Sequence, residues 1–486
     1  MHQAPALASA KVPRNLLVAG ITLDSRAVRP GDLYAALPGA TTHGARFADQ
    51  ATDAGAAAIL TDASGSQLCP DSPVPVIVVA DPRAMLGDLS SWIYHQPAGD
   101  LLLIGVTGTN GKTTMTYLLA EALAAAGHTT GVIGTIGIKV GHQDLPSART
   151  TPEAPDVHAA LAVMREQGVT AVAMEVSSHA LVLGRVAGLA FDVAVFTNLS
   201  QDHLDFHQDM ADYFAAKRQL FEPGRSKRAV ICVDDAWGRR LAESSEIPRV
   251  TYGRDEPADW SLVDLRVLRS GGWDAAARGP NLTVPVSSDL PGRFNQANVL
   301  GALAAAAGAG IDPQAAAAGL ARCRGVPGRM EAVSAPEFAA FVDYAHTPEA
   351  VARAIGAVRE FSSGKVIVAL GCGGDRDPGK RPLMGIVAAR GADIVIVTDD
   401  NPRSEDPAMI RQAVLEGAVR AESGAEISEI PDRAAAIRAA VDRAQPGDAV
   451  LILGKGHEQG QEVRGVVTPF DDRVVLASAI TAGGAR

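Results

Sequence analysis

Residues 101–114 read LLLIGVTGTNGKTT, an apolar run that breaks into a glycine-bearing polar loop. The run Leu101–Val106 predicts a buried parallel strand, and the following residues, MTYLLAEALAAAG, predict a helix. A loop between a strand and a helix N-terminus points successive backbone N–H groups at one spot, where the helix dipole also favours anions. The segment therefore predicts a phosphate-binding loop in a parallel α/β sheet.

Two side chains of this loop suit a nucleotide. The ammonium of Lys112 can reach terminal phosphates, and the hydroxyl of Thr113 can bind Mg²⁺. The spacing is tighter than in the general Walker pattern, because GTNGKT has fewer residues between its two glycines. The alternative is a glycine-rich turn that only joins strand and helix. We expect nucleotide contacts from Gly108, Thr109, Asn110, Gly111, Lys112, Thr113 and Thr114.

Length and composition limit the class of protein. A chain of 486 residues exceeds what one hydrophobic core usually supports, so two to three domains are expected. The net charge of −11 argues against nucleic acid or an anionic membrane as the main partner. The four cysteines are far apart and form no Cys-x-x-Cys pair, which fits a reducing cytoplasm. The N-terminal residues MHQAPALASAKVPRN lack a continuous apolar core of signal-peptide length, and no apolar run of the chain reaches the length of a membrane span, so we expect a cytoplasmic protein.

Polar residues close the strands predicted after the loop. Strand and helix alternation predicts βαβ units, and ligands bind at the carboxyl edge of such sheets. Glu175 ends the predicted strand Val169–Val176, either as an acid for a nucleotide–Mg²⁺ complex or as a cap of the next turn. His203, in NLSQDHLDFH, can be a metal ligand, a substrate contact or a satisfied core histidine. Lys217, in the predicted helix 212–221, is by default a solvated helix lysine.

The flanking regions carry weaker signals. Residues 1–98 predict a small α/β domain, in which LDSR (23–26) and TTHG (41–44) are ordinary turns on the residues alone. Residues 235–290 predict irregular, β-rich structure. RCRGVPGR (322–329) predicts a linker whose last arginine can reach a nucleotide phosphate.

Residues 330–486 predict a second doubly wound α/β unit. Helices are expected at 348–361, 381–390, 407–419 and 431–444. Three apolar runs of this unit end in charged loops, DRD (375–377), DNPR (400–403) and GKGHE (454–458). If the strands are parallel, these loops share one edge, where guanidinium and carboxylate groups would suit an amino acid. Surface salt bridges between the loops are the competing explanation.

Nine motifs in one order connect the chain to a known family. They are GTNGKTT, MEVSSHAL, FTNLSQDHLDFH, DYFAAK, GRFNQAN, VDYAHTPEA, GCGGDRDPGKRPLMG, DDNPR and GKGHE. By these motifs the chain resembles the Mur ligases of peptidoglycan synthesis from about residue 23 to residue 458. The resemblance implies three α/β domains: a UDP-sugar-binding domain (1–98), a central P-loop ATP-binding domain (99–329) and a Rossmann-like domain for the incoming amino acid (330–486).

The resemblance also implies a reaction. ATP would phosphorylate the free carboxylate of UDP-N-acetylmuramoyl-L-alanyl-D-glutamate, and the amine of meso-2,6-diaminopimelate would attack the acyl phosphate. Lys112, the loop N–H groups and Mg²⁺ would neutralise the phosphoryl charge. We expect a monomer that binds neither nucleic acid nor membrane.

Residue roles follow from the same resemblance. It implies catalytic roles for Lys112, Glu175, His203 and Lys217, and metal contacts for Thr113, Glu175, His203 and Lys217, with Lys217 carbamylated. It implies further nucleotide contacts for Asn295, Arg329, Asp343 and His346. It implies UDP-dipeptide contacts for Ser25, Thr42, His43, Thr150, Thr151, Ser177 and Arg185, and amino-acid contacts for Arg376, Asp400, Asn401, Arg403, Gly454 and Glu458. Leu183 departs from the family pattern, because some relatives have a glutamine there.

The DNPR motif favours diaminopimelate over lysine. Only diaminopimelate has a second carboxylate, for which Arg403 and Asn401 offer partners, while Glu458 and the Gly454 carbonyl suit the distal ammonium. A lysine substrate would leave the Arg403 guanidinium unpaired, at a cost of about 1–3 kcal/mol or more. The alternatives are a lysine-adding ligase of the same family, a ligase similar to folylpolyglutamate synthetase, and a nucleotide-gated interaction protein that does not catalyse.

Overall fold

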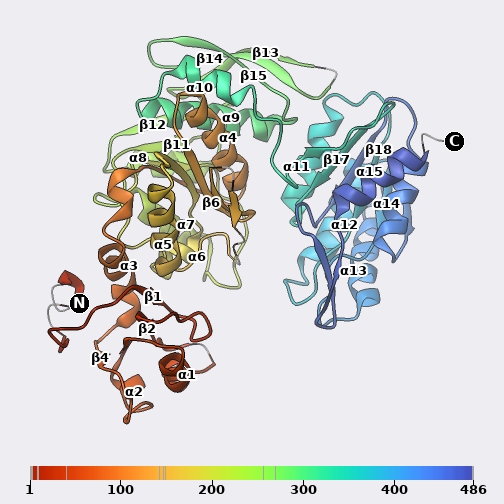
Figure 1. Cartoon of the computed structure of the whole chain (residues 1–486). Coiled ribbons are helices and arrows are strands. Elements are labelled where there is room, and N and C mark those ends of the chain that lie inside the picture. Colours follow the sequence, from red (N-terminus) through yellow and green to blue (C-terminus); the bar gives the residue numbers. More distant parts are fainter. Residues whose placement is uncertain are drawn as a thin grey trace. The chain divides into compact units, whose positions relative to one another are not determined.

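The computed structural model describes residues 4–7, 10–39, 41–141, 143–145, 147, 149–255, 257–268 and 270–483. Within them the protein is α/β with largely parallel sheets, as the sequence predicts (Figure 1). The chain divides into two compact units, Met1–Thr251 with Ala304–Asp312, and Tyr252–Leu303 with Pro313–Arg486. In the described part of the chain, no helix has both the length and the apolar character needed to cross a bilayer.

A four-stranded parallel sheet lies near the N-terminus. Its strands, in spatial order, are β1 (Gly20–Thr22), β2 (Asp32–Ala35), β3 (Ala58–Thr61) and β4 (Val76–Val78). The helices are α1 (Ala48–Asp53), α2 (Ala63–Ser66) and α3 (Pro82–Ile93). The start of α3 is fixed locally, because Asp81 accepts a hydrogen bond from the Ala84 N–H and proline occupies the first turn.

An eight-stranded sheet carries the phosphate-binding loop. Its order is β12-β11-β10-β5-β9-β6-β7-β8. Central β5 (Leu102–Thr107) pairs in parallel with β9 (Ala171–Glu175) and β10 (Val193–Phe196), and its last five residues are buried. The other elements are β6 (Thr130–Gly134), β7 (Gly137–Val140), β8 (Gln143–Leu145), β11 (Ala229–Cys232), β12 (Arg249–Tyr252), α4 (Lys112–Ala125), α5 (Ala154–Glu166), α6 (Ser178–Val182) and α7 (Met210–Arg218).

The prediction for residues 235–290 is wrong at its start. Residues Ala236–Ser244 form helix α8, capped by the Asp235 carboxylate, which accepts from the Gly238 N–H. The rest is β-rich as expected, with an antiparallel sheet of β13 (Ser261–Val267), β14 (Trp273–Arg278) and β15 (Thr283–Ser288). Helices α9 (Arg293–Gly308) and α10 (Pro313–Leu320) follow.

A six-stranded sheet forms the C-terminal part. Its order is β16 (Glu331–Ala332), β17 (Ala339–Asp343), β21 (Ala449–Leu453), β18 (Val366–Leu370), β19 (Ile394–Val397) and β20 (Glu426–Glu429), and all but β16 run in parallel. The helices are α11 (Pro348–Arg359), α12 (Lys380–Gly391), α13 (Pro407–Arg420), α14 (Arg433–Asp442) and α15 (Asp472–Gly483). The four predicted helices of this unit are confirmed.

Both faces of this sheet are buried. Val366, Val368 and Leu370 of β18 join one apolar cluster with residues of α11, α12 and α13, while Ile367 and Ala369 join a second with residues of α14 and α15. Covering on both faces explains why the strands are continuous apolar runs rather than alternating ones. The strand ends are therefore the places where this unit can present polar groups.

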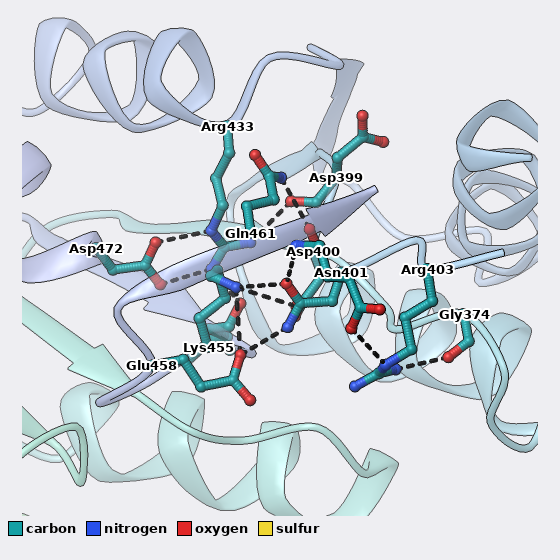
Figure 2. Close-up of polar contacts among 12 residues, drawn as sticks. Gly374, Asp399, Asp400, Asn401, Arg403, Arg433, Lys455, Glu458, Gln461 and Asp472 are labelled. Carbon is teal, nitrogen blue, oxygen red and sulfur yellow. Dashed lines mark hydrogen bonds and ion pairs between the residues drawn. The ribbon is translucent and has the colours of Figure 1, made fainter. Parts of the chain in front are cut away.

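A buried ion pair ties helices to strand ends. Arg433, at the start of α14, donates to both carboxylate oxygens of Asp472 at 2.7 and 2.6 Å, and both side chains are fully buried (Figure 2). The same guanidinium donates to the carbonyls of Asp399 and Leu453, both at 3.1 Å. Arg433 thus joins the chain after β19 and the end of β21 to the first turn of α15.

Asp472→Asn should lower the free energy of unfolding by about 3–5 kcal/mol, because the buried guanidinium of Arg433 would lose its counter-charge. Calorimetry and urea denaturation would measure the loss. The matched control is Asp432→Asn, because Asp432 is exposed and caps α14, and asparagine caps as well as aspartate. An equal loss in both variants would contradict a special role of the buried pair.

Candidate functional site

The phosphate-binding loop requires glycine at its first turn. Gly108 has φ 150°, and a Cβ there would lie 1.9 Å from Thr197 Oγ1. The loop backbone is fixed to the end of β10, where the Thr109 N–H donates to the Asn198 carbonyl at 2.8 Å and the Asn110 N–H donates to Asn198 Oδ1 at 3.0 Å. The loop is therefore held in its shape by the neighbouring strand, which supports the phosphate-binding interpretation over a simple turn.

Two lysine side chains converge on this loop. Lys112 Nζ donates to the carbonyls of Gly108 and Thr109 at 3.0 and 2.9 Å. Lys217, on α7, donates to the same Gly108 carbonyl at 2.8 Å. Lys217 is 1% exposed, so the default interpretation as a solvated helix lysine is wrong. The helix turns this residue toward the loop, a contact that the amphipathic pattern of α7 alone could not predict.

Burial changes the protonation of Lys217. Desolvation, and next the nearby charge of Lys112, hold the pKa of the Lys217 ammonium well below its usual value, while Asp202 acts in the opposite sense. The ammonium lies 4.6 Å from the centre of the Tyr213 ring. This environment favours the neutral amine, which is the nucleophilic form of lysine.

Glu175 ends β9 and binds the turn after β6. Its carboxylate accepts from the Thr135 N–H at 2.8 Å and from the Thr135 hydroxyl at 3.2 Å, and its side chain is buried. Thr135 also donates to the hydroxyl of Thr150 at 3.0 Å. The carboxylate therefore caps a turn, but this is the turn after β6 and not the next turn of the chain that the alternative named. A metal contact of Glu175 stays a prediction.

His203 is partly exposed and stands in a group of aromatic rings. Its backbone is left-handed, with φ 55°, and its ring lies 4.9 Å from that of His179 and 6.0 Å from that of Tyr213, between centres. Its Nε2 is 3.6 Å from the Asp202 carboxylate. Since its side chain is 42% exposed, His203 is not a core histidine.

His179 and His207 are site residues that the sequence analysis did not assign. Burial, and next the nearby His203, lower the pKa of His179 to about 4. His207 is buried and within hydrogen-bonding distance of the Ser178 hydroxyl, at 2.9 Å, and of the Asp212 carboxylate, at 3.2 Å. Their place in the motifs SSHAL and HLDFH was the available signal.

The oxygen atoms of this site suit a Mg²⁺ ion that is also bound by the phosphates of a nucleotide. Among the described residues, no group of three or more His, Cys, Asp or Glu side chains is placed to hold a metal. Mg²⁺ at nucleotide sites needs only one or two protein ligands, with phosphates and water supplying the rest. The hydroxyl of Thr113, in the first turn of α4, and the carboxylate of Glu175 are such oxygen donors. The ammonium groups of Lys112 and Lys217 oppose a cation here, unless Lys217 is modified.

A second group of predicted residues is joined to Glu175 by hydrogen bonds. Thr151 Oγ1 donates to the Glu175 carbonyl at 2.8 Å and accepts from the Ser177 N–H at 3.1 Å. Arg185 donates to the Thr151 carbonyl at 3.3 Å. The predicted UDP-dipeptide contacts Thr150, Thr151, Ser177 and Arg185 therefore lie together.

Glu153 is a further member of this group that the sequence analysis missed. Its carboxylate pairs with three guanidinium groups, of Arg83 at 3.3 Å, Arg149 at 2.7 Å and Arg185 at 2.9 Å. Three cations around one anion leave an excess of positive charge. Such an excess suits an anionic ligand in an otherwise acidic protein.

Two N-terminal candidates are joined by their side chains to more distant segments of the same domain. Ser25 Oγ donates to Gln50 Oε1 at 2.8 Å. His43 Nδ1 accepts from the Ala45 N–H at 3.0 Å, and its Nε2 lies 3.2 Å from the Asp62 carboxylate. Thr42 is exposed. The bond between His43 and Ala45 is typical of an ordinary turn, whereas the contacts with Gln50 and Asp62 join different segments. A substrate role of the three residues stays a prediction.

In the second unit, three nucleotide candidates gather at the end of β17. The Asp343 carboxylate accepts from the N–H groups of Met330 and Ala345 at 2.7 and 2.8 Å. Burial raises the pKa of Asp343. The guanidinium of Arg329 lies 4.5 Å from the centre of the Tyr344 ring, and His346 Nδ1 lies 2.9 Å from the Tyr344 carbonyl oxygen.

The fourth nucleotide candidate is Asn295, in the first turn of α9. It is buried, donates to the Pro291 carbonyl at 2.8 Å and accepts from Asn298 at 3.1 Å. Its amide is thus engaged within its own segment, and a nucleotide contact stays a prediction.

The loops after β18, β19 and β21 meet, as the parallel strands predict (Figure 2). Asn401 Nδ2 donates to Glu458 Oε2 at 2.7 Å. Gly454 has φ 120°, and a Cβ there would lie 2.4 Å from Asp400 Oδ2, so only glycine lets the two loops come this close. Asp400, Asn401, Gly454 and Glu458 therefore form one group.

Arg403 extends this group toward the loop after β18. Its guanidinium donates to the Gly374 carbonyl at 2.6 Å and lies 3.7 Å from the Glu462 carboxylate. Arg376 is exposed and donates to the carbonyl of its neighbour Asp375 at 3.2 Å. Arg403 is thus seated beside the group, while Arg376 makes only a local contact.

Two further features of this site were not predicted. Lys455, fully buried, donates to Asn401 Oδ1 at 2.9 Å and to Glu458 Oε2 at 3.2 Å. A hairpin of β22 (Gly460–Val463) and β23 (Val466–Pro469) supports the DNPR loop. The Arg403 N–H donates to the Glu462 carbonyl at 3.1 Å, and Gln461 donates to the Asp400 carbonyl at 2.8 Å.

Comparison with known proteins gives matches along most of the chain. Three family models match: the catalytic domain of the Mur ligase family over residues 17–94, the Mur ligase middle domain over 106–306, and the Mur ligase glutamate ligase domain over 328–456. A Streptomyces avermitilis protein named UDP-N-acetylmuramoyl-L-alanyl-D-glutamate--2,6-diaminopimelate ligase is 52% identical over 98% of this chain and 94% of its own. A Streptomyces coelicolor protein of that name is 54% identical over 95% and 92%. A solved structure of that name has a TM-score of 0.68 and 35% identity over 96% and 95%.

Gly108→Ala should weaken the binding of a non-hydrolysable nucleoside triphosphate by at least about tenfold, because the new Cβ would displace the loop from Thr197. Titration calorimetry would measure the affinity. Gly127→Ala is the matched control, since Gly127 is also left-handed, with φ 91°, but has open space around it. The control should lose stability, about 1–2 kcal/mol, without losing affinity. Similar weakening in both variants would contradict the steric argument.

Proposed function

This chain belongs to the Mur ligase family, and from that premise we propose that it joins meso-2,6-diaminopimelate to UDP-N-acetylmuramoyl-L-alanyl-D-glutamate. It is an ATP-dependent ligase of peptidoglycan precursor synthesis. The observation that carries this function is the meeting of Asn401, Arg403 and Glu458 at one sheet edge, in a chain more than half identical to ligases of that name. Guanidinium, amide and carboxylate together match an amino acid with charges at both ends.

We propose that three domains each bind a different substrate. Residues 1–98 would bind the UDP part of the substrate, residues 99–329 would bind ATP, and residues 330–486 would bind the amino acid. Each range contains a parallel sheet of its own, which supports the division. The group of Thr150, Ser177, Arg185 and Glu153 supports binding of the acidic dipeptide on the central domain.

The chemistry proceeds in two transfers. An oxygen of the substrate carboxylate attacks the γ-phosphorus of ATP, and the bond to ADP breaks. The neutral amine of diaminopimelate then attacks the acyl carbon, and the bond to phosphate breaks as the nitrogen loses a proton. Lys112 and the loop N–H groups would offset the negative charge of the transferred phosphoryl group. Mg²⁺ would supply further charge neutralisation on the phosphates.

We propose Thr113, Glu175, His203 and a carbamylated Lys217 as the protein groups that hold the metal. A carbamate forms when a neutral amine adds to CO₂, and the lowered pKa of Lys217 provides that amine. The product carries a negative charge and two oxygens. It would remove the repulsion that two neighbouring ammonium groups exert on a cation.

Selectivity for diaminopimelate rests on Arg403 in this proposal. Among the described residues, its guanidinium has one hydrogen bond, to Gly374, and a looser pairing with Glu462. The second carboxylate of diaminopimelate would accept further hydrogen bonds from this guanidinium, whereas a lysine substrate would leave those donors without acceptors.

We further propose that the protein acts in the cytoplasm as a monomer, without nucleic acid or membrane. The net charge of −11 supports the absence of polyanionic partners.

Phosphate release from ATP and the UDP-linked dipeptide should depend on meso-diaminopimelate. With L-lysine, kcat/KM should be at least about a hundredfold lower, because the site would hold an unpaired guanidinium. A coupled phosphate assay with each amino acid measures the ratio. A higher kcat/KM with L-lysine would assign a lysine-adding ligase, equal values would contradict the selectivity for diaminopimelate, and release only with a folate and glutamate would assign a folylpolyglutamate-type ligase.

The variant Arg403→Ala tests whether this guanidinium is the group that selects diaminopimelate. The variant should raise the KM for diaminopimelate and leave the KM for ATP unchanged. It should also lower the ratio of kcat/KM for diaminopimelate to kcat/KM for lysine. Arg420→Ala is the matched control, because Arg420 is an exposed arginine of the same domain that pairs only with Glu416 on its own helix. Equal effects on both KM values would contradict the assigned role of Arg403.

Lys217→Ala should abolish ligation, and short carboxylates such as acetate should restore part of it by supplying the missing anionic oxygens. Wild-type protein incubated with ¹³C-bicarbonate should show a carbamate carbon resonance that Lys217→Ala lacks. Lys227→Ala, which removes an exposed lysine, should keep both the resonance and the activity. Absence of the resonance from the wild-type protein would refute the carbamate.

A further inference from the structure

Lys455 is a buried cation for which the proposed reaction has no use. It lies in the loop after β21, is fully buried, and is enclosed by groups from two loops (Figure 2). Its ammonium donates to Asn401 and Glu458 and lies 3.8 Å from the carboxylate of Asp400. Burying an ammonium costs several kcal/mol unless acceptors surround it, so its presence among three residues of the amino-acid site needs a reason.

Lys455 fixes the orientation of the Asn401 amide. An ammonium and a backbone N–H are donors only, so the atom facing both must be the amide oxygen. Asn401 Oδ1 accepts from Lys455 Nζ at 2.9 Å and from the Glu462 N–H at 3.0 Å. The amide nitrogen then points at Glu458, to which it gives one hydrogen. Its second hydrogen is left for a ligand acceptor such as a carboxylate.

The same lysine orients the carboxylate of Glu458. Both of its donors, Asn401 Nδ2 at 2.7 Å and Lys455 Nζ at 3.2 Å, reach the oxygen Oε2. Oε1 is therefore the oxygen that remains for a ligand ammonium. The side chain of Glu458 is 30% exposed, so this oxygen can be reached, whereas Lys455 itself cannot.

The formal charges of this group favour an incoming cation. The carboxylates of Asp400 and Glu458 and the ammonium of Lys455 sum to minus one. Arg433, the other nearby buried cation, is already matched by Asp472. A ligand ammonium would balance this charge, and the guanidinium of Arg403, which lies beside the group, would balance the carboxylate at the same end of a diamino acid.

We propose that Lys455 is a positioning residue for the amino-acid substrate. It does not touch the ligand; it holds Asn401 and Glu458 so that one amide hydrogen and one carboxylate oxygen face the distal carboxylate and ammonium. This inference rests on the proposed function and assigns the distal end of the substrate to that site. Lysine suits the place because a compact ammonium has several donors at one point, whereas methionine has none.

The test compares Lys455→Met with Lys365→Met, an exposed lysine just before β18. Lys455→Met should raise the KM for meso-diaminopimelate by roughly ten- to a hundredfold, the loss of one or two charge-assisted hydrogen bonds. The KM values for ATP and for the UDP-linked dipeptide should stay within about twofold, because their binding does not use this group. Lys365→Met should change none of them.

A substrate analogue separates positioning from a purely structural role. 2-Aminopimelate keeps both carboxylates of diaminopimelate but lacks the distal ammonium. The wild-type preference for diaminopimelate over this analogue, as a ratio of kcat/KM values, should fall at least about tenfold in Lys455→Met. A general loosening of the fold would slow both substrates equally and leave that ratio unchanged.

Three results would overturn the inference. They are an unchanged KM for diaminopimelate, an equal rise of all three KM values, and an unchanged preference over 2-aminopimelate. If Lys455→Met does not fold, Lys455→Gln replaces it, because its amide can still donate to Asn401, and an intermediate loss of the preference is then expected. Wild-type protein that releases no phosphate with diaminopimelate would overturn the proposed function as well, whereas an active wild type with unaffected Lys455 variants would overturn only this inference.

Discussion

The arrangement of several loops in this protein depends on buried lysine and arginine side chains. A buried cation must be surrounded by acceptors, so it draws carbonyls and carboxylates from several segments to one point. Arg433 does so for the ends of β19 and β21, and Lys455 does so for the two loops that follow them. In the first unit, the side chains of Lys112 and Lys217 both donate to the Gly108 carbonyl, so two helices hold the phosphate-binding loop by the same kind of contact.

Cationic side chains are grouped at two places in this acidic chain. The net charge is −11, yet two lysines contact the phosphate-binding loop and three arginines surround Glu153. Positive charge is concentrated where burial raises its effect, since electrostatic interactions strengthen as water is excluded. Around Lys455 the balance is reversed, because the carboxylates of Asp400 and Glu458 outnumber its one ammonium.

The sequence predicted the features that depend on local pattern. The strand, loop and helix around Lys112 follow from hydrophobic period and glycine placement, and the meeting of the DNPR and GKGHE loops follows from the rule that parallel strands end at one edge. The remaining features depend on contacts between residues that are far apart in the sequence. Nothing in the amphipathic pattern of α7 places Lys217 against the loop, and the pattern predicted a solvated side chain. The burial of Lys455, the support from β22 and the pairing of Glu153 with three arginines all need the folded chain.

The hairpin that supports Arg403 is itself weakly anchored. Val463, Val466 and Val467 are 39%, 63% and 65% exposed, so hydrogen bonds to the DNPR loop, rather than apolar burial, hold β22 in place. Segments of this kind open at a free energy below that of global unfolding, and their amides exchange with solvent hydrogen early. Mild heating would therefore loosen the loop of Arg403 while the sheets beneath remain folded. Under the proposed role of Arg403, the enzyme would lose its selectivity at a lower temperature than its fold.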